Sequence, residues 1–86
     1  MASYRIEWKR SALKDLRKLP KETIVRIVAA VEDLAHDPHP PGSRKLVGSE
    51  RTYRIREGVY RVVYNVEEVA LVVEVVRVAH RKDAYE

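Results

Sequence analysis

Three residues near the end of the sequence carry side chains that together could cleave a phosphodiester. His80, Arg81 and Tyr85 place an imidazole, a permanent cation and a phenol within six residues. Metal-free cleavage of RNA needs a group that takes a proton from the 2′-hydroxyl, a cation that stabilises the crowded phosphorane and a donor for the leaving 5′-oxygen. These side chains suit those roles, although polar residues near a chain end also serve solubility alone.

A run of cations in the middle of the chain is the second set of chemically capable side chains. Residues 44–61 contain six arginines or lysines and two acidic residues, a surplus equal to the formal net charge of +4 of the whole chain. The guanidinium fork binds phosphate in a bidentate manner, which favours a polyanion as partner over simple surface charge. The cations are Arg44, Lys45, Arg51, Arg54, Arg56 and Arg61.

Alternation along a strand decides which of these cations share a face. Arg54 and Arg56 alternate with apolar residues in one predicted strand, and Arg61 does so in the next. We expect the apolar sets to face the helices and the three arginines to lie on the uncovered side. A short turn would place Arg56 opposite Arg61, which destabilises a sheet by up to roughly 1 kcal/mol. A bound anion would explain why such a pair is retained.

Two helices are predicted in the first half of the chain. In the first, Leu13, Leu16 and Leu19 form an apolar stripe, Ser11 is the expected N-cap, and Pro20 ends the helix. The second helix also has apolar residues spaced three and four apart. Both helices should pack one face against a sheet.

Four strands are predicted, one before the helices and three after a proline-rich loop. Residues 4–8 alternate between apolar and polar, and residues 52–56, 60–66 and 71–78 form the other three candidates. The short connections between the last three imply antiparallel pairing. The order β-α-α-β-β-β predicts a small α+β domain, with two N-terminal helices packed on one face of an antiparallel sheet.

Length and composition limit the chain to a single domain, residues 1–86. Without cysteine there is no disulfide, thiolate metal site or cysteine nucleophile. His36 and His39 lack a third ligand, so neither a metal nor a cofactor is expected. No apolar run is long enough to span a bilayer and no secretory signal is apparent, which predicts a cytoplasmic protein without a membrane partner.

Three segments, in this order and spacing, also resemble one known family. Residues 12–20, 53–64 and 78–85 resemble the RelE/ParE superfamily of toxins from toxin–antitoxin systems, and the resemblance extends over most of the chain. It implies a β-α-α-β-β-β toxin that enters the ribosomal A site and cuts mRNA through the substrate's own 2′-hydroxyl. It also implies a cognate antitoxin that restrains the toxin in a hetero-oligomer.

The resemblance further implies roles for individual residues. Arg61 and Arg81 fall on the family's phosphate-stabilising arginines, and Tyr85 falls on its C-terminal tyrosine. Under the nuclease hypothesis, flanking phosphates of mRNA or ribosomal RNA would be bound by Arg44, Lys45 and Arg51, together with Arg54 and Arg56.

The identity of the general base stays open. Arg54 and Arg56 stand where the RelE branch carries two lysines, one of them proposed as the base. Arginine remains protonated and is a poor proton acceptor. His80 is the better candidate because an imidazole exchanges protons near neutral pH.

Two alternatives share the expected fold. A ParE-like toxin would poison DNA gyrase by binding and would need no RNA-cleaving site. A catalytically inactive relative would bind only its antitoxin or RNA, and the missing lysines keep this reading open. The combination of Arg61, Arg81 and Tyr85 favours the nuclease.

Overall fold

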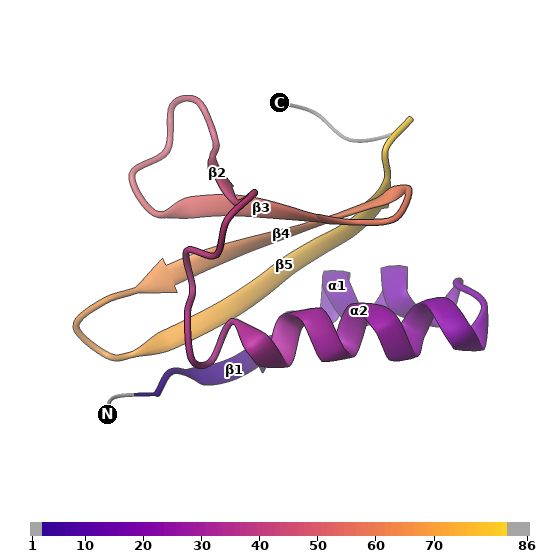
Figure 1. Ribbon diagram of the computed structural model, residues 1–86, viewed down its shortest axis with the longest axis horizontal. Helices are drawn as coiled ribbons and strands as arrows, with labels where there is room; N and C mark the ends of the chain where they lie inside the picture. The colour runs from indigo at the N-terminus through magenta and orange to yellow at the C-terminus, as the bar shows by residue number, and fades with distance from the viewer. Residues whose placement is uncertain (1–2, 83–86) are drawn as a thin grey trace.

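Residues 3–82 are described by the computed structural model, in which a pair of helices covers one face of a five-stranded sheet (Figure 1). Across the sheet the strand order is β1-β5-β4-β3-β2. The elements in chain order are β1 (Arg5–Trp8), α1 (Arg10–Arg17), α2 (Lys21–Asp33), β2 (Arg44–Lys45), β3 (Thr52–Glu57), β4 (Tyr60–Glu67) and β5 (Val72–His80).

The fold class and the helical layer confirm the prediction, but the sheet is mixed. β3, β4 and β5 are antiparallel neighbours as expected, whereas β1 runs parallel to β5. Parallel neighbours need a long connection, which here is everything between β1 and β5. β2 was not predicted, because a strand of two residues leaves no alternation to read.

The core lies between α2 and the covered face of the sheet. Burial of these side chains removes apolar surface from water and is the main stabilising contribution to a domain of this size. The largest fully buried side chains, each at most 1% exposed, are Ile27, Val31, Leu34, Val62, Tyr64, Val73 and Val75.

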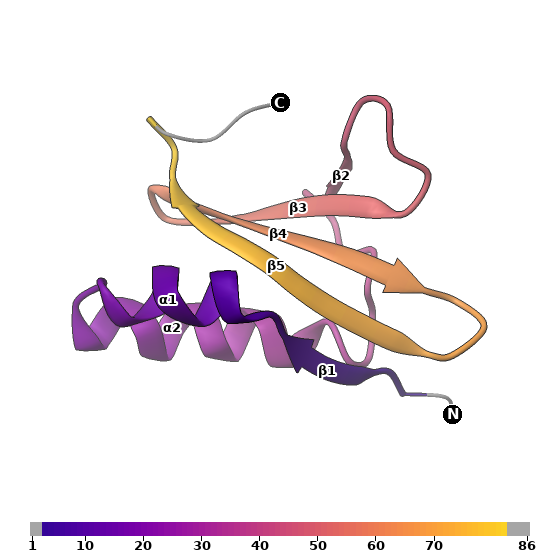
Figure 2. The ribbon, with the colours of Figure 1, turned by 180° about the vertical axis from the view of Figure 1, so that it is seen from behind.

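α1 covers the part of the β5 edge that β1 leaves open (Figure 2). β1 pairs with β5 only as far as Val75, so the backbone groups beyond it need other partners. The hydroxyl of Ser11 donates to the carbonyl oxygen of Val76 at 2.7 Å. One carboxylate oxygen of Asp15 accepts two hydrogen bonds. The backbone amide of Val78 donates one at 2.9 Å, and Nε of Arg77 donates the other at 2.8 Å.

This attachment decides which face of α1 is buried. Ala12 and Leu16 point into the core, while Leu13 is 37% exposed. Leu13, one of the three leucines of the predicted apolar stripe, therefore lies outside the core. Ser11 is not the N-cap either, because the cap position is Lys9 and the Ser11 hydroxyl is used by the strand edge.

Replacing Asp15 by alanine is expected to lower the free energy of unfolding by about 1–3 kcal/mol. The substitution leaves the Val78 amide without its acceptor and removes the ion pair with Arg77. Urea unfolding followed by circular dichroism measures the loss. Asp33→Ala, at an exposed aspartate of α2, is the control and should change the stability little. Equal stability of the two variants would contradict the attachment described above.

Ionisation of Tyr64 is expected to lower the free energy of unfolding at alkaline pH. Its ring is fully buried and its hydroxyl donates to the carbonyl oxygen of Pro38 at 2.7 Å. Burial raises the pKa of Tyr64 to about 12. The stability contributed by the neutral phenol is complete below the unfolded-state pKa of about 10 and is lost as the pH rises through the folded value.

Tyr64→Phe is therefore expected to flatten the fall in stability between pH 10 and 12. The shift of Tyr64 corresponds to roughly 3 kcal/mol over that interval. At neutral pH the same variant loses about 1–2 kcal/mol, because the Pro38 carbonyl is left buried without its donor. Thermal unfolding at a series of pH values measures both effects. A slope identical to that of the wild type would exclude Tyr64 as the group responsible.

Candidate functional site

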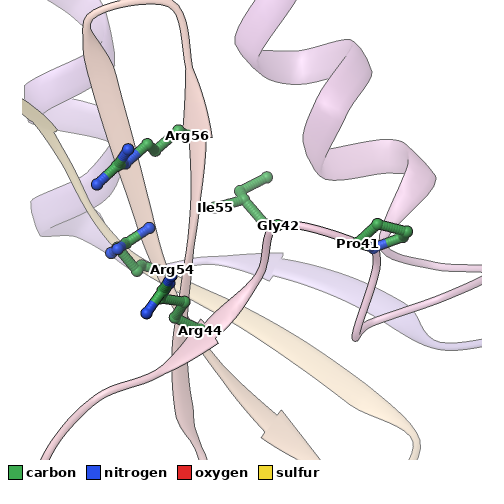
Figure 3. A pocket seen from close by; sticks show the side chains of 6 residues that line it. All are labelled: Pro41, Gly42, Arg44, Arg54, Ile55 and Arg56. Atoms are coloured by element: carbon green, nitrogen blue, oxygen red, sulfur yellow. The ribbon is translucent and has the colours of Figure 1, made fainter.

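Arginines from three strands lie on the uncovered face of the sheet. Arg56 of β3 is opposite Arg61 of β4, as predicted, and Arg44 of β2 is opposite Arg54, a pair that was not predicted. Residues directly opposite each other share a face, and so do residues two apart in a strand. Figure 3 shows Arg44, Arg54 and Arg56 extending to the same side while Ile55 points away. We call Arg44, Arg54, Arg56 and Arg61 the arginine face.

A two-residue turn between β3 and β4 fixes this register. Gly58 occupies its first position with a φ of +61°, a conformation that other residues rarely adopt. Glu57 and Tyr60 are the last paired residues on either side. A slip by one residue would turn Arg56 toward the helices, so the turn is part of the site.

The first hollow on this face lies between β3 and the loop before β2 (Figure 3). Its volume is about 270 Å³. Arg54 is only 4% exposed and forms its floor, whereas Arg44 and Arg56 are exposed at its rim. The complete lining is Pro41, Gly42, Arg44, Arg54, Ile55 and Arg56.

A second hollow of about 260 Å³ lies at the turn and is lined by Arg56, Gly58, Tyr60, Arg61 and Arg81. Three guanidinium groups from β3, β4 and the end of β5 therefore border one small space. Such a space suits an anion whose charge increases during reaction, because the donors are already in place. Arg56 borders both hollows, which makes them neighbouring parts of one site.

A β-bulge in β5 sets the direction of Arg81. Val63 pairs with Arg77 and Tyr64 with Val75, so Val76 is the extra residue. Beyond a bulge the alternation of faces is shifted by one residue, which places Arg81 on the side of the arginine face.

The amide of Arg81 also donates to the carbonyl oxygen of Val59 at 2.7 Å. This bond extends the pairing past His80, the last residue of β5. It holds the chain beside the turn and so positions the Arg81 side chain at the second hollow.

His80 faces the other side of the sheet from Arg61 and is not brought into the second hollow. It lies opposite Tyr60, with the two ring centroids 5.5 Å apart in an edge-to-face arrangement. Nδ1 of His80 accepts the amide hydrogen of Lys82 at 3.1 Å. A neutral ring in this arrangement carries its proton on Nε2, so this atom can donate but cannot accept.

Two other predicted residues lie apart from the hollow at the turn. Lys45 is opposite Tyr53 and therefore on the helix side of the edge strand. Arg51 precedes β3 at the end away from the turn and forms an ion pair with Glu67. Tyr85 lies outside the described residues.

Tyr60 was missed as a site residue from the sequence. Its place in an alternating apolar strand assigned it to the core, and its ring does pack against that core. It also lines the second hollow and contacts His80. In the sequence, the feature that could have indicated this role is its position as the first residue after the turn.

The loop that borders the first hollow is held at its beginning. Nε2 of His39 lies 3.2 Å from Glu68, and the hydroxyl of Tyr4 donates to the same carboxylate at 2.5 Å. The hydrogen bonds from Tyr4 and then His39 hold the pKa of Glu68 below its usual value. The His39 ring also lies edge-on to Tyr53. These contacts fix the approach of the chain to β2 and thereby to Arg44.

Within residues 3–82, no three histidine, aspartate or glutamate side chains come together as ligands for a metal ion. In the same part of the chain, no helix has the length and apolar character needed to cross a membrane.

Comparison with protein families places the chain among known toxins. Residues 6–85 match the profile described as ParE toxin of the type II toxin–antitoxin system parDE. Toxin RelG of Mycobacterium tuberculosis is 34% identical to the chain, and the match covers 95% of each. A putative toxin RelE1 of Methanocaldococcus jannaschii is 29% identical over 95% of this chain and 94% of its own length.

Solved structures give the same assignment. The toxin–antitoxin complex RelBE2 of M. tuberculosis matches with a TM-score of 0.84 and 29% identity, covering 96% of this chain and 97% of the other. The archaeal RelE–RelB complex of Pyrococcus horikoshii matches with a TM-score of 0.83 and 30% identity over 95% and 99%. With the whole sheet and both helices shared, the chain belongs to the ParE toxin family of type II toxin–antitoxin systems and is a RelE-like toxin.

Proposed function

We propose that this toxin inhibits translation by cutting mRNA on the ribosome without a metal ion. The observation that carries the proposal is the hollow at the turn, where Arg56, Arg61 and Arg81 border one space. The similarity to proteins named as RelE toxins supports a toxin of the same kind. Cytoplasmic localisation follows, because translating ribosomes are the target.

In the proposed reaction the 2′-oxygen of the substrate attacks the adjacent phosphorus. A bond from phosphorus to the 2′-oxygen forms while the bond to the 5′-oxygen breaks, which leaves a cyclic phosphate and a 5′-hydroxyl. Arg61 and Arg81 stabilise the phosphorane, whose charge exceeds that of the bound diester. The proton lost by the 2′-hydroxyl is balanced by one gained at the 5′-oxygen.

The group that protonates the leaving oxygen and the group that takes the 2′-proton are proposed to be different. His80 faces the other side of the sheet from Arg61, so it could serve the leaving oxygen only after Nδ1 releases the Lys82 amide and the ring turns toward the hollow. Tyr85 is therefore the proposed proton donor. Removal of the 2′-proton needs an acceptor other than the arginines. A neighbouring group of the ribosome or the RNA itself would meet that need.

Flanking phosphates would be bound along the rest of the cationic surface. Arg44 and Arg54 line the first hollow beside Arg56, so an extended RNA strand can follow β3 from one hollow to the next. Lys45 and Arg51 would contact ribosomal RNA or mRNA farther out. Arg51 would have to exchange its ion pair with Glu67 for a phosphate.

An antitoxin is the proposed protein partner. Two of the similar structures are described as complexes of a RelE-type toxin with RelB. A basic toxin with pI near 9.6 favours a partner segment that is acidic. The two proteins would form a hetero-oligomer in which the toxin is inactive.

Primer extension on translated mRNA tests the proposal directly. Wild-type toxin should produce cuts that require both ribosomes and an open reading frame, with a 5′-hydroxyl on the downstream fragment. Cuts in naked RNA at the same rate would show that the ribosome is dispensable. Growth arrest without any cuts would exclude the nuclease.

The matched family is described as ParE toxins, so the ParE-like, gyrase-directed toxin of the sequence analysis is the second candidate. Inhibition of DNA supercoiling by the purified protein would support it. Normal growth at high expression would instead identify an inactive, binding-only relative.

A further inference from the structure

The first hollow on the arginine face presents more cations than one RNA phosphate needs. Arg44, Arg54 and Arg56 border a space of about 270 Å³, and no acidic side chain of residues 3–82 is among its lining residues. An internal phosphate of RNA brings one negative charge to these three guanidinium groups. The hollow therefore suits a more highly charged anion better than it suits a phosphodiester.

The strands hold the three guanidinium groups close enough to contact one small ligand. Arg44 lies directly opposite Arg54 in the β2–β3 pair, at a backbone separation of about 5 Å. Arg56 is two residues farther along β3, about 7 Å from Arg54. Figure 3 shows the three side chains extending to the same side of the sheet. A ligand in the hollow can therefore be contacted by three cations at once.

The hollow is partly shielded from water, and its wall is fixed before a ligand binds. Arg54 is only 4% exposed, and attraction between charges is stronger where water is partly excluded. Pro41 and Gly42 supply the wall from the loop before β2. A hydrogen bond of 2.7 Å from the hydroxyl of Tyr64 to the carbonyl oxygen of Pro38 holds this loop. A wall that is already ordered lowers the entropy lost on binding.

We infer that the first hollow binds a pyrophosphate group, as inorganic pyrophosphate or as the diphosphate of a nucleotide, and that this ligand competes with RNA. A terminal phosphate carries about −1.5 to −2 at pH 7, and the attached second phosphate adds charge within the same small space. Guanidinium groups bind such oxygens in a bidentate manner. The bound anion also offsets the repulsion between Arg44 and Arg54, like charges that lie directly opposite each other.

Occupation of the first hollow controls the toxin at the level of RNA binding. Arg56 borders both hollows, so a pyrophosphate held by Arg56 takes a cation away from the path of the RNA strand. A cell rich in such compounds therefore holds more of the toxin free of RNA. The binding of pyrophosphate is independent of the nuclease activity, whereas its inhibitory effect rests on the proposed function above.

Isothermal titration calorimetry of the toxin with inorganic pyrophosphate, in buffer without magnesium, measures the binding. Arg44→Gln should weaken it by roughly tenfold, the loss expected for one charge-assisted contact. Lys45→Gln removes the same charge from the next residue of β2, which lies opposite Tyr53 and therefore on the other side of the sheet. This control should stay within about twofold of wild type. Equal weakening in the two variants would overturn the inference, because only long-range attraction would then be involved.

The position and the charge of the ligand are tested separately. Arg81→Gln changes only the second hollow and should stay within about twofold of wild type. A loss as large as that of Arg44→Gln would move the ligand to the second hollow and overturn the assignment.

An RNA dinucleotide, with a single phosphodiester, should bind roughly tenfold more weakly than pyrophosphate. Equal affinities would show that charge does not select the ligand, which would also overturn the inference. A nucleoside diphosphate serves as the third ligand. Tighter binding than that of pyrophosphate identifies a nucleotide as the source of the group, and equal or weaker binding identifies inorganic pyrophosphate.

Displacement of a short fluorescent RNA from the toxin tests the competition. Pyrophosphate should displace the RNA from the wild type, and the Arg44→Gln variant should need roughly tenfold more of it. RNA that stays bound at saturating pyrophosphate would place the two ligands at separate sites and overturn the inference. Pyrophosphate binding and RNA displacement by a toxin that cuts no mRNA on ribosomes would instead reject the proposed nuclease activity alone.

Discussion

Replacing Arg81 by alanine is expected to slow mRNA cleavage by roughly 10²- to 10³-fold, the usual loss when a donor to a developing charge is removed. The side chain is exposed and borders the hollow at the turn, so the loss should fall on the rate constant, with little change in stability. Single-turnover cleavage on programmed ribosomes measures it. Lys82→Ala removes the adjacent exposed cation and should retain most of the activity.

Arg61→Ala should have an effect of similar size, and the double variant should lose much less than the product of the two. Groups that act on the same phosphate as a unit are non-additive. Full additivity would mean that Arg61 and Arg81 act on separate phosphates. Unchanged cleavage in Arg81→Ala would remove the basis of the nuclease assignment.

Replacing Arg56 by glutamine should change stability and RNA binding in opposite directions. The variant is expected to gain up to roughly 1 kcal/mol in free energy of unfolding, because Arg56 no longer faces Arg61 across the β3–β4 pair. RNA affinity should fall, and the slope of log affinity against log salt should decrease by about one, as for the loss of one phosphate contact. Urea unfolding and fluorescence anisotropy at several salt concentrations measure the two quantities.

Arg26→Gln on α2 is the matched control, since it removes the same charge from an exposed helix position. It should leave the salt slope unchanged. If Arg56→Gln destabilised the protein, the repulsion between the two arginines would already be compensated within the fold. Their pairing would then give no reason to expect a bound anion.

The arginine face could be predicted because only local rules were needed. Alternation placed Arg54 and Arg56 together, and a two-residue turn placed Arg56 opposite Arg61. Neither step depends on distant parts of the chain. The same reasoning identified the apolar stripe of α2 and the hairpins that follow the proline-rich loop.

The direction of the C-terminal residues could not be predicted in this way. The bulge at Val76 shifts the alternation in β5, and nothing in a run of valines marks which residue will be the extra one. Because of this bulge, His80 lies on the same face of the sheet as Tyr60, while Arg81 lies on the arginine face.

The orientation of α1 depends equally on tertiary contacts. Leu13, Leu16 and Leu19 form a plausible stripe, yet the bonds from Ser11 and Asp15 to β5 rotate the helix so that Leu13 faces outward. Those bonds exist only because β1 stops before β5 does. The end of β1 therefore decides which side of α1 is buried and which side is exposed.

The position of β5 between β1 and β4 also affects how the toxin folds during its synthesis. β1 is made first, but within residues 3–82 its only neighbour in the sheet is β5, the last strand of that range to be synthesised. The nascent polypeptide cannot complete the sheet until residues 72–80 have left the exit tunnel, and contacts of such long sequence separation form slowly. Arg81 joins Arg61 only after that event, so the ribosome that makes the toxin has finished reading these codons before a competent site exists.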